Sequence, residues 1–128
     1  MLIYRLENPK TRRGPFNTGV DADWDAYFAD TVFKYPEIAV TREYGNSLFW
    51  DDIRNMQHFY GKEAFFGAPD ELWFHRWFNH YWMAFFKSKG YQAYLYDVFD
   101  AYVIDSPSPA EVAFIPIEKI LTRTLITQ

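Results

Sequence analysis

The sequence predicts a single α+β domain over residues 1–128, with a twisted, mostly antiparallel sheet packed against one long aromatic helix and one or two shorter helices. Helical spacing of apolar residues is confined to the first 90 residues, whereas β-rich stretches separated by turns dominate from Tyr91 onward. The length allows one core without disulfides or metals. The aromatic share is 22%, about double that of ordinary globular proteins.

The N-terminal part is expected to contain one strand and one helix. Residues 2–6 alternate in polarity as a strand does, and Asn8-Pro9 ends them. Asp21 is expected to cap a helix that stops at Tyr35-Pro36, because the residue before a proline avoids helical geometry. One face of this helix carries apolar residues at i, i+3, i+4 and i+8, namely Trp24, Tyr27, Phe28 and Val32.

The middle of the chain is expected to hold a short helix, two extended pieces and the main helix. Residues 37–42 and 65–68 are expected to be extended, and between them Ser47 is expected to cap a helix that Gly61 ends. The main helix is expected over residues 70–89, with acidic residues in its first turn. Lys87, Lys89 and Gly90 are the matching C-terminal signals.

The C-terminal part is expected to supply most of the sheet. Strands are expected at residues 92–98, 101–104, 111–117 and 121–126, with a Ser-Pro turn cluster at residues 105–109. Proline cannot donate to a strand ladder. Pro116 therefore places the end of its strand at a sheet edge or just past the ladder.

Composition excludes several classes of protein. The chain has no cysteine, so it has no disulfide or thiolate metal site, which fits a cytosolic protein. No apolar run approaches the roughly 20 residues of a membrane-spanning helix, and residues 1–7 lack the layout of a signal peptide. The formal net charge is −4, and Lys10, Arg12 and Arg13 form the main basic cluster. We therefore expect neither a nucleic acid nor a membrane as partner.

The familiar metal-binding and catalytic patterns are not found in this sequence. His75 and His80 are five residues apart, so they point about 140° away from each other on a helix and do not form a helical zinc pair. Glu71 and His75 have the right spacing, but two ligands are too few, and we expect no metal. The chain lacks a Gly-x-Ser-x-Gly elbow and a phosphate-binding glycine loop.

The main helix carries aromatic residues around much of its circumference. The stripe expected to face the core consists of Phe74, Phe78, Tyr81, Trp82 and Phe85. Trp73, Trp77 and Phe86 extend the aromatic surface beyond this stripe. A helix that is apolar nearly all round is either buried on several sides or used as an interface, and both interpretations stay open here. In the second interpretation, these three residues contact a partner protein, because large rings are enriched at binding hot spots.

Several short segments resemble known protein families. Ile-Tyr-Arg-Leu at residues 3–6, followed by Arg-Gly-Pro-Phe at residues 13–16, resembles the first strand and loop of ADP-ribosyltransferase-like folds. Residues 110–120 resemble the last motif of these folds, in which a glutamate or glutamine begins a strand. Residues 65–72, together with Arg-Trp-Phe at 76–78 and Gly-Tyr at 90–91, are similar to small phage and prophage proteins.

The resemblance implies a set of residues that contact NAD. It implies that Arg5 contacts a phosphate or ribose of NAD and that Phe16 lies in the NAD-binding loop. It implies that Glu111 is the catalytic acid, which stabilises the positive charge that develops as nicotinamide leaves. The chain departs from the family at residues 67–69, Gly-Ala-Pro, where a serine or threonine commonly supports the NAD pocket. The alternative is that Arg5 is a surface charge on an edge strand and Glu111 an exposed turn residue.

These observations lead to one principal functional hypothesis and two alternatives. The principal hypothesis is a small phage accessory protein in the host cytoplasm, without a resident cofactor. It would bind a host protein, such as a component of bacterial defence, through its aromatic surface and inhibit it by occupancy. The first alternative is an active mono-ADP-ribosyltransferase that uses NAD to modify that host protein. The second is a structural or virion component, which would form a symmetric oligomer.

Overall fold

The computed structural model describes residues 1–17, 19–38 and 48–127, and its first sheet is built on β3 (Gln92–Asp97). β3 lies between β1 (Leu2–Glu7) and β6 (Thr122–Leu125), and both pairings are antiparallel. The β1–β3 register pairs Leu2 with Asp97 and Glu7 with Gln92. The strands predicted from the sequence at residues 2–6, 92–98 and 121–126 are therefore confirmed to within one or two residues.

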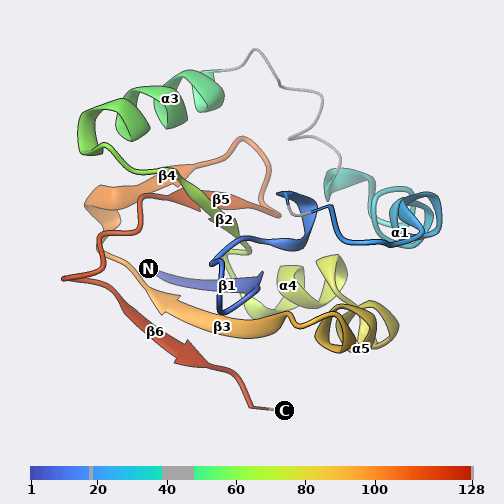
Figure 1. Ribbon diagram of the computed structural model, residues 1–128. Helices are drawn as coiled ribbons and strands as arrows, with labels where there is room; N and C mark the ends of the chain where they lie inside the picture. Colours follow the sequence, from blue (N-terminus) through green and yellow to red (C-terminus); the bar gives the residue numbers. More distant parts are fainter. Residues whose placement is uncertain (18, 39–47, 128) are drawn as a thin grey trace.

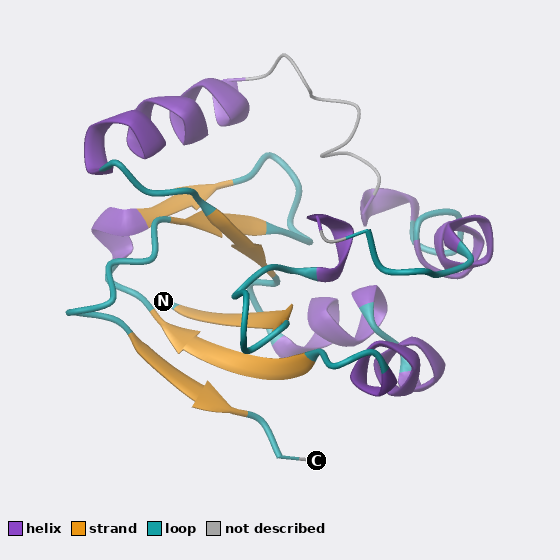
Figure 2. Cartoon of the chain, in the orientation of Figure 1, coloured by secondary structure: helices purple, strands orange, loops and turns teal. Residues whose placement is uncertain are grey.

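The second sheet has β5 (Val112–Phe114) between β2 (Phe65–Gly67) and β4 (Val103–Asp105), again with antiparallel pairings. The two sheets lie next to each other in Figure 2. They are joined where Tyr4 of β1 pairs with Ala68, each amide nitrogen donating to the other residue's carbonyl oxygen over 2.8–2.9 Å. The α+β class and the antiparallel pairing are confirmed, but the strands form two three-stranded sheets and not the single sheet that was predicted.

The described residues contain four α-helices. They are α1 (Trp24–Thr31), α3 (Leu48–Tyr60), α4 (Glu71–Trp77) and α5 (His80–Ser88). Short 3₁₀ turns occupy Pro15–Asn17, Pro36–Ile38 and Asp100–Tyr102. Figure 1 shows α1, α4 and α5 together on one side of the molecule, with α3 on the far side of the second sheet.

Three apolar clusters fill the spaces between these layers. Aromatic side chains of α1, α4 and α5 pack on the first sheet at Leu6 and Ala93. A second cluster lies between the two sheets and includes Ile3, Tyr96 and Phe114. The third joins α3 to β4 and β5, and its buried members are Phe49, Ile53, Ala64, Ile104, Ala113 and Ile115. Helices therefore pack on part of the outer face of the first sheet and on the second sheet, and the two sheets pack against each other within the molecule.

The single long helix predicted over residues 70–89 is wrong, because the chain breaks it at Phe78 and Asn79. Asn79 adopts an extended conformation and its side chain accepts a hydrogen bond from the Trp82 amide nitrogen at 3.0 Å, so it is the N-cap of α5. An asparagine competes with the helical backbone for hydrogen bonds, which favours a cap over a mid-helix position. Asp30 of α1 holds this corner by accepting from Trp82 Nε1 at 3.1 Å.

Other boundaries also differ from the prediction. The α1 N-cap is Asp23, not Asp21, and its side chain accepts from the Ala26 amide nitrogen at 3.0 Å. Residues 100–102 form a 3₁₀ turn, so the strand predicted at 101–104 begins only at Val103. The helix ended by Gly61 is confirmed, with φ at +64° for this glycine. Ser47 and residues 39–42 lie outside the described residues.

Candidate functional site: an aromatic pocket where the sheets meet

A pocket of about 480 Å³ opens beside the junction of β1 and β2. This volume falls in the range typical of small-molecule sites. Its wall is mostly aromatic, and the contributing rings are those of Tyr4, Phe16, Trp24, Phe28, Trp50, Phe66, Phe74, Trp77 and Phe78. The indole nitrogen of Trp50 is buried and has no hydrogen-bond partner among the described residues. The pocket therefore combines broad apolar walls with a small number of polar groups.

Phe16 stands at one wall of the pocket on the Pro15–Asn17 turn. Its ring centroid is 5.7 Å from Trp24, 5.8 Å from Tyr27 and 6.0 Å from Trp77. Despite these neighbours, 48% of Phe16 is exposed. The ring is thus surrounded by aromatic side chains, while nearly half of the residue remains exposed.

Trp77 lies in the pocket wall and not on an outward-facing surface of α4. Its indole nitrogen donates to the Ala110 carbonyl oxygen at 2.8 Å, and its own carbonyl oxygen accepts from the Tyr27 hydroxyl at 2.8 Å. These bonds connect α4 to α1 and to the segment just before β5. Trp77 therefore supports the position of Glu111, which is the next residue after Ala110.

Arg5 crosses the junction of the sheets from β1. Its Nη1 donates to the Phe66 carbonyl oxygen at 2.7 Å and its Nη2 to the Arg12 carbonyl oxygen at 2.8 Å. Its guanidinium carbon lies 4.3 Å from the centroid of the Phe65 ring. Only 7% of the residue is exposed, so Arg5 is not a surface charge of an edge strand. Burial lowers the pKa of Arg5 and the nearby Glu7 carboxylate opposes this, and an arginine remains charged under both effects.

Glu7 is a completely buried carboxylate at the end of β1. It accepts hydrogen bonds from Arg5 Nε and Arg12 Nε, each at 3.0 Å, and from the Tyr96 hydroxyl. Arg123 Nε lies 3.7 Å from the same carboxylate. Burial, followed by the hydrogen bond to Glu7, raises the pKa of Tyr96 and keeps its hydroxyl protonated as a donor.

The sequence interpretation missed Glu7. One signal was present, because Arg5 and Glu7 share a face of β1 with Ile3 in the two-residue period of a strand. Charged residues alternating in this way usually indicate a solvated face. Only the packing of the second sheet on that face shows that both side chains are buried.

Glu111 lines the same pocket from the residue directly before β5. It is partly buried, and it follows Ala110, which is completely buried. The pocket therefore brings together Arg5, Phe16, Trp77 and Glu111, which are spread over more than 100 positions of the chain. Three of them are the residues for which the resemblance implied contact with NAD.

Trp73 and Phe86, the other predicted partner contacts, lie outside the pocket. Phe86 is 0% exposed and packs at 5.7–5.9 Å from the rings of Phe78 and Tyr27, so it is a core residue and its assignment as a surface contact is corrected. The break at residues 78–79 turns α5 so that this side of the helix faces α1. Trp73 is partly buried and lies 4.6 Å under the Arg76 guanidinium.

The described part of the chain contains no group of three or more His, Cys, Asp or Glu side chains that could hold a metal ion. His75 Nε2 lies 3.5 Å from Glu71 Oε1, as their spacing predicted, and both side chains are exposed. Within the described ranges, no helix is both long enough and apolar enough to cross a membrane.

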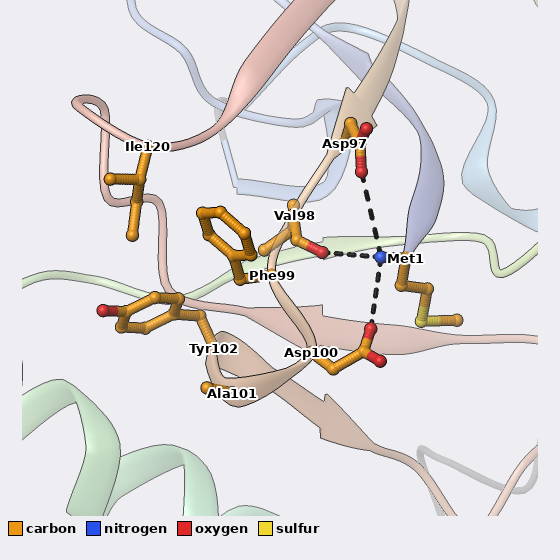
Figure 3. A pocket seen from close by; sticks show the side chains of 8 residues that line it. All are labelled: Met1, Asp97, Val98, Phe99, Asp100, Ala101, Tyr102 and Ile120. Atoms are coloured by element: carbon orange, nitrogen blue, oxygen red, sulfur yellow. Dashed lines mark hydrogen bonds and ion pairs between the residues drawn. The ribbon is translucent and has the colours of Figure 1, made fainter.

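A second hollow, of about 700 Å³, lies at the other end of the first sheet (Figure 3). The ammonium group of Met1 lines it and contacts the Val98 carbonyl oxygen at 2.6 Å and the carboxylates of Asp97 and Asp100. Phe99 and Ile120 supply its apolar side. The charges in this hollow pair with one another, and none of the predicted site residues lies there. The aromatic pocket is the better candidate site.

Comparison with known protein families identifies a family of phage proteins that matches most of this chain. The family model described as bacteriophage T4 Y00F protein matches residues 1–115. The chain belongs to this family. The match includes every residue that lines the aromatic pocket, and it confirms the phage part of the sequence resemblance. Comparisons with curated proteins and with solved structures found no match.

Proposed function

We propose that this Y00F-family protein is a phage accessory protein whose aromatic pocket binds NAD. One observation carries the proposal, namely that Arg5, Phe16 and Glu111 line one cavity although they come from three distant parts of the chain. Their residue types suit a nucleotide, because rings stack on planar bases, guanidinium groups bind phosphates and carboxylates accept ribose hydroxyls.

The proposal gives each residue a separate role. Phe16, which is 48% exposed, stacks on the nicotinamide or adenine ring. Arg5 offers N–H groups to a phosphate, because its bonds to described residues use three of its five N–H groups. Glu111 holds a ribose hydroxyl and would stabilise positive charge at the ribose carbon during nicotinamide departure.

The end of β2, at Gly67, gives a reason to test NAD binding before ADP-ribose transfer. A Cβ atom at Gly67 would lie 2.5 Å from Ile3 Cγ2 and 2.7 Å from the Tyr4 carbonyl oxygen, so no side chain fits there. The serine or threonine of the ADP-ribosyltransferase pattern therefore has no place at this residue. The pocket keeps an arginine and a carboxylate but lacks this side-chain hydroxyl.

We expect the wild-type protein to give a saturable heat of NAD binding by isothermal titration calorimetry. Glu111→Gln should weaken binding by about 1–3 kcal/mol, because it removes a charged acceptor of a hydrogen bond. Glu63→Gln is the matched control, since Glu63 is exposed and does not line the pocket. A flat titration of the wild type at about 1 mM NAD, the upper end of usual substrate affinities, would contradict the proposal.

Transfer is tested separately by incubating the protein and a host extract with a labelled NAD analogue. Label on a host protein that disappears with Glu111→Gln makes Glu111 the catalytic acid and the chain a mono-ADP-ribosyltransferase. NAD binding without label leaves the chain as an NAD-binding protein. Circular dichroism of each variant shows that its fold is retained.

Inhibition of a host protein by occupancy is the second candidate function. Exposed apolar side chains on α4 and α5 favour it, since Leu72 is 60% and Tyr81 67% exposed. Trp73, the residue after Leu72 on α4, is partly buried. Of the three residues first predicted to contact a partner, Trp73 is the one that stays close to this surface, because Phe86 is buried and Trp77 lines the pocket.

Trp73→Ala should weaken binding to a purified host target by at least about 2 kcal/mol if occupancy is the function. Surface plasmon resonance measures the affinity. Leu125→Ala is the control, because Leu125 is 47% exposed and lies on β6, at the edge of the first sheet opposite β1. Equal affinities of the folded Trp73→Ala variant and the wild type would remove Trp73 from the interface.

A further inference from the structure

We propose that Glu7 is a positioning residue that holds the Arg5 guanidinium in the pocket wall and fastens the loop of residues 8–14 as the pocket rim. The inference rests on the proposed function. The part of the ligand that contacts Arg5 would be an anionic group, such as the phosphates of NAD.

Glu7 completes a three-sided hold on Arg5. Two sides are backbone carbonyl oxygens, one from β2 and one from the loop, at 2.7 and 2.8 Å from Nη1 and Nη2. The third side is Glu7 Oε1 at 3.0 Å from Nε, and it is the one that carries charge. The guanidinium is thereby fixed in plane, whereas an arginine held by two carbonyls alone would keep more rotamers.

Glu7 also holds the loop through its second oxygen. Glu7 Oε2 accepts from Arg12 Nε at 3.0 Å, and Arg12 Nη2 donates to the Tyr96 hydroxyl at 2.9 Å. The backbone of Arg12 has φ of +65°, a conformation that side-chain-bearing residues rarely adopt. Strained backbone of this kind persists where surrounding contacts over-determine it, and the bond to Glu7 is the one contact of Arg12 with a completely buried carboxylate.

The held guanidinium borders the pocket at Gly14. A Cβ atom at Gly14 would lie 3.7 Å from Nη1 and 3.9 Å from Nη2 of Arg5, and both residues line the pocket. The loop that Glu7 fastens thus runs directly into the Gly14-Pro15-Phe16 wall. Movement of Arg12 would shift this wall, and rotation of Arg5 would withdraw its N–H groups from the ligand.

The test compares Glu7→Gln with Glu118→Gln. Glu118 is the matched control because it also pairs with Arg12, at 3.0 Å from Nη1, but is 53% exposed. Calorimetry is run with NAD and with adenosine, which has no phosphate. We expect Glu7→Gln to weaken NAD binding at least tenfold and adenosine binding by a smaller factor, because adenosine loses only the ordered Phe16 wall and not a phosphate contact, and we expect Glu118→Gln to change neither. Equal NAD affinity of Glu7→Gln and wild type would overturn the inference and leave the proposed function standing.

A second measurement separates failure of the inference from failure of the proposed function. The Arg5 Nε–Hε signal of ¹⁵N-labelled protein should exchange slowly with water in the wild type and rapidly in Glu7→Gln. If the wild type binds no NAD, the proposed function fails and this signal alone decides the positioning role: slow exchange in Glu7→Gln overturns it, and rapid exchange supports it. Glu7→Asp keeps the charge on a shorter side chain, so its Arg5 Nε–Hε signal should exchange at a rate between those of the wild type and Glu7→Gln. If Glu7→Gln does not fold, Glu7→Asp replaces it in both assays.

Discussion

Replacing Glu7 with alanine is expected to lower the free energy of unfolding by about 3–5 kcal/mol, because it removes one partner of a buried ionic network. The carboxylate is completely buried and bonded to Arg5, Arg12 and Tyr96, with Arg123 close by. Without it, the nearly buried Arg5 guanidinium would lose its charged partner while remaining out of water. Urea denaturation followed by tryptophan fluorescence measures the change.

Glu118→Ala is the control for this result, because Glu118 pairs with Arg12 from the exposed side of the network. An exposed ion pair contributes about 0–1 kcal/mol, so this variant should stay close to the wild type. A Glu7→Ala variant as stable as Glu118→Ala would show that the buried carboxylate adds nothing to folding.

Gly67→Ala is expected to lower the free energy of unfolding by about 1–3 kcal/mol, because the added methyl group has no space at the junction of the sheets. The new Cβ would lie 2.5 Å from Ile3 Cγ2 and 2.7 Å from the Tyr4 carbonyl oxygen. The second contact is with backbone, so relief requires that β1 and β2 move apart at the Tyr4–Ala68 bridge. Thermal and urea unfolding measure the loss.

Gly14→Ala separates this steric effect from the general effect of replacing a glycine. A Cβ at Gly14 would meet its nearest atom, the Leu6 carbonyl oxygen, at 3.6 Å, which is ordinary contact. Its stability should therefore change by no more than about 0.5 kcal/mol. Equal stabilities for the two variants would mean that the junction adapts to a side chain at residue 67.

The elements whose signals are local in sequence could be predicted. β1 and β3 follow from short alternating or β-rich segments, and α3 ends at Gly61 as expected. The main helix could not be predicted as two helices from periodicity, because aromatic spacing continues across Asn79. The break is stabilised by a cap and by bonds from Asn79 and Trp82 to Asp30, which is 49 residues away from Asn79.

The candidate site was predicted in part. The sequence drew attention to Arg5, Phe16, Trp77 and Glu111, and the structure places all four around one pocket. It did not indicate Glu7, and it assigned Phe86 to a surface that the fold buries completely. Both errors concern burial, which depends on the sheet or helix that packs on a residue and not on its neighbours along the chain.

The α+β class, the strand and helix propensities and the set of aromatic and charged side chains available to a site follow from the order of residues along the chain. Three other features depend on tertiary packing: β1 and β2 meet at Gly67, Glu7 lies inside a cluster of arginines, and distant aromatic residues line one pocket. The physical reason is that periodicity records which face of one element is apolar. The pairing of two sheets, and hence the burial of a charge between them, depends on contacts between residues far apart in the chain.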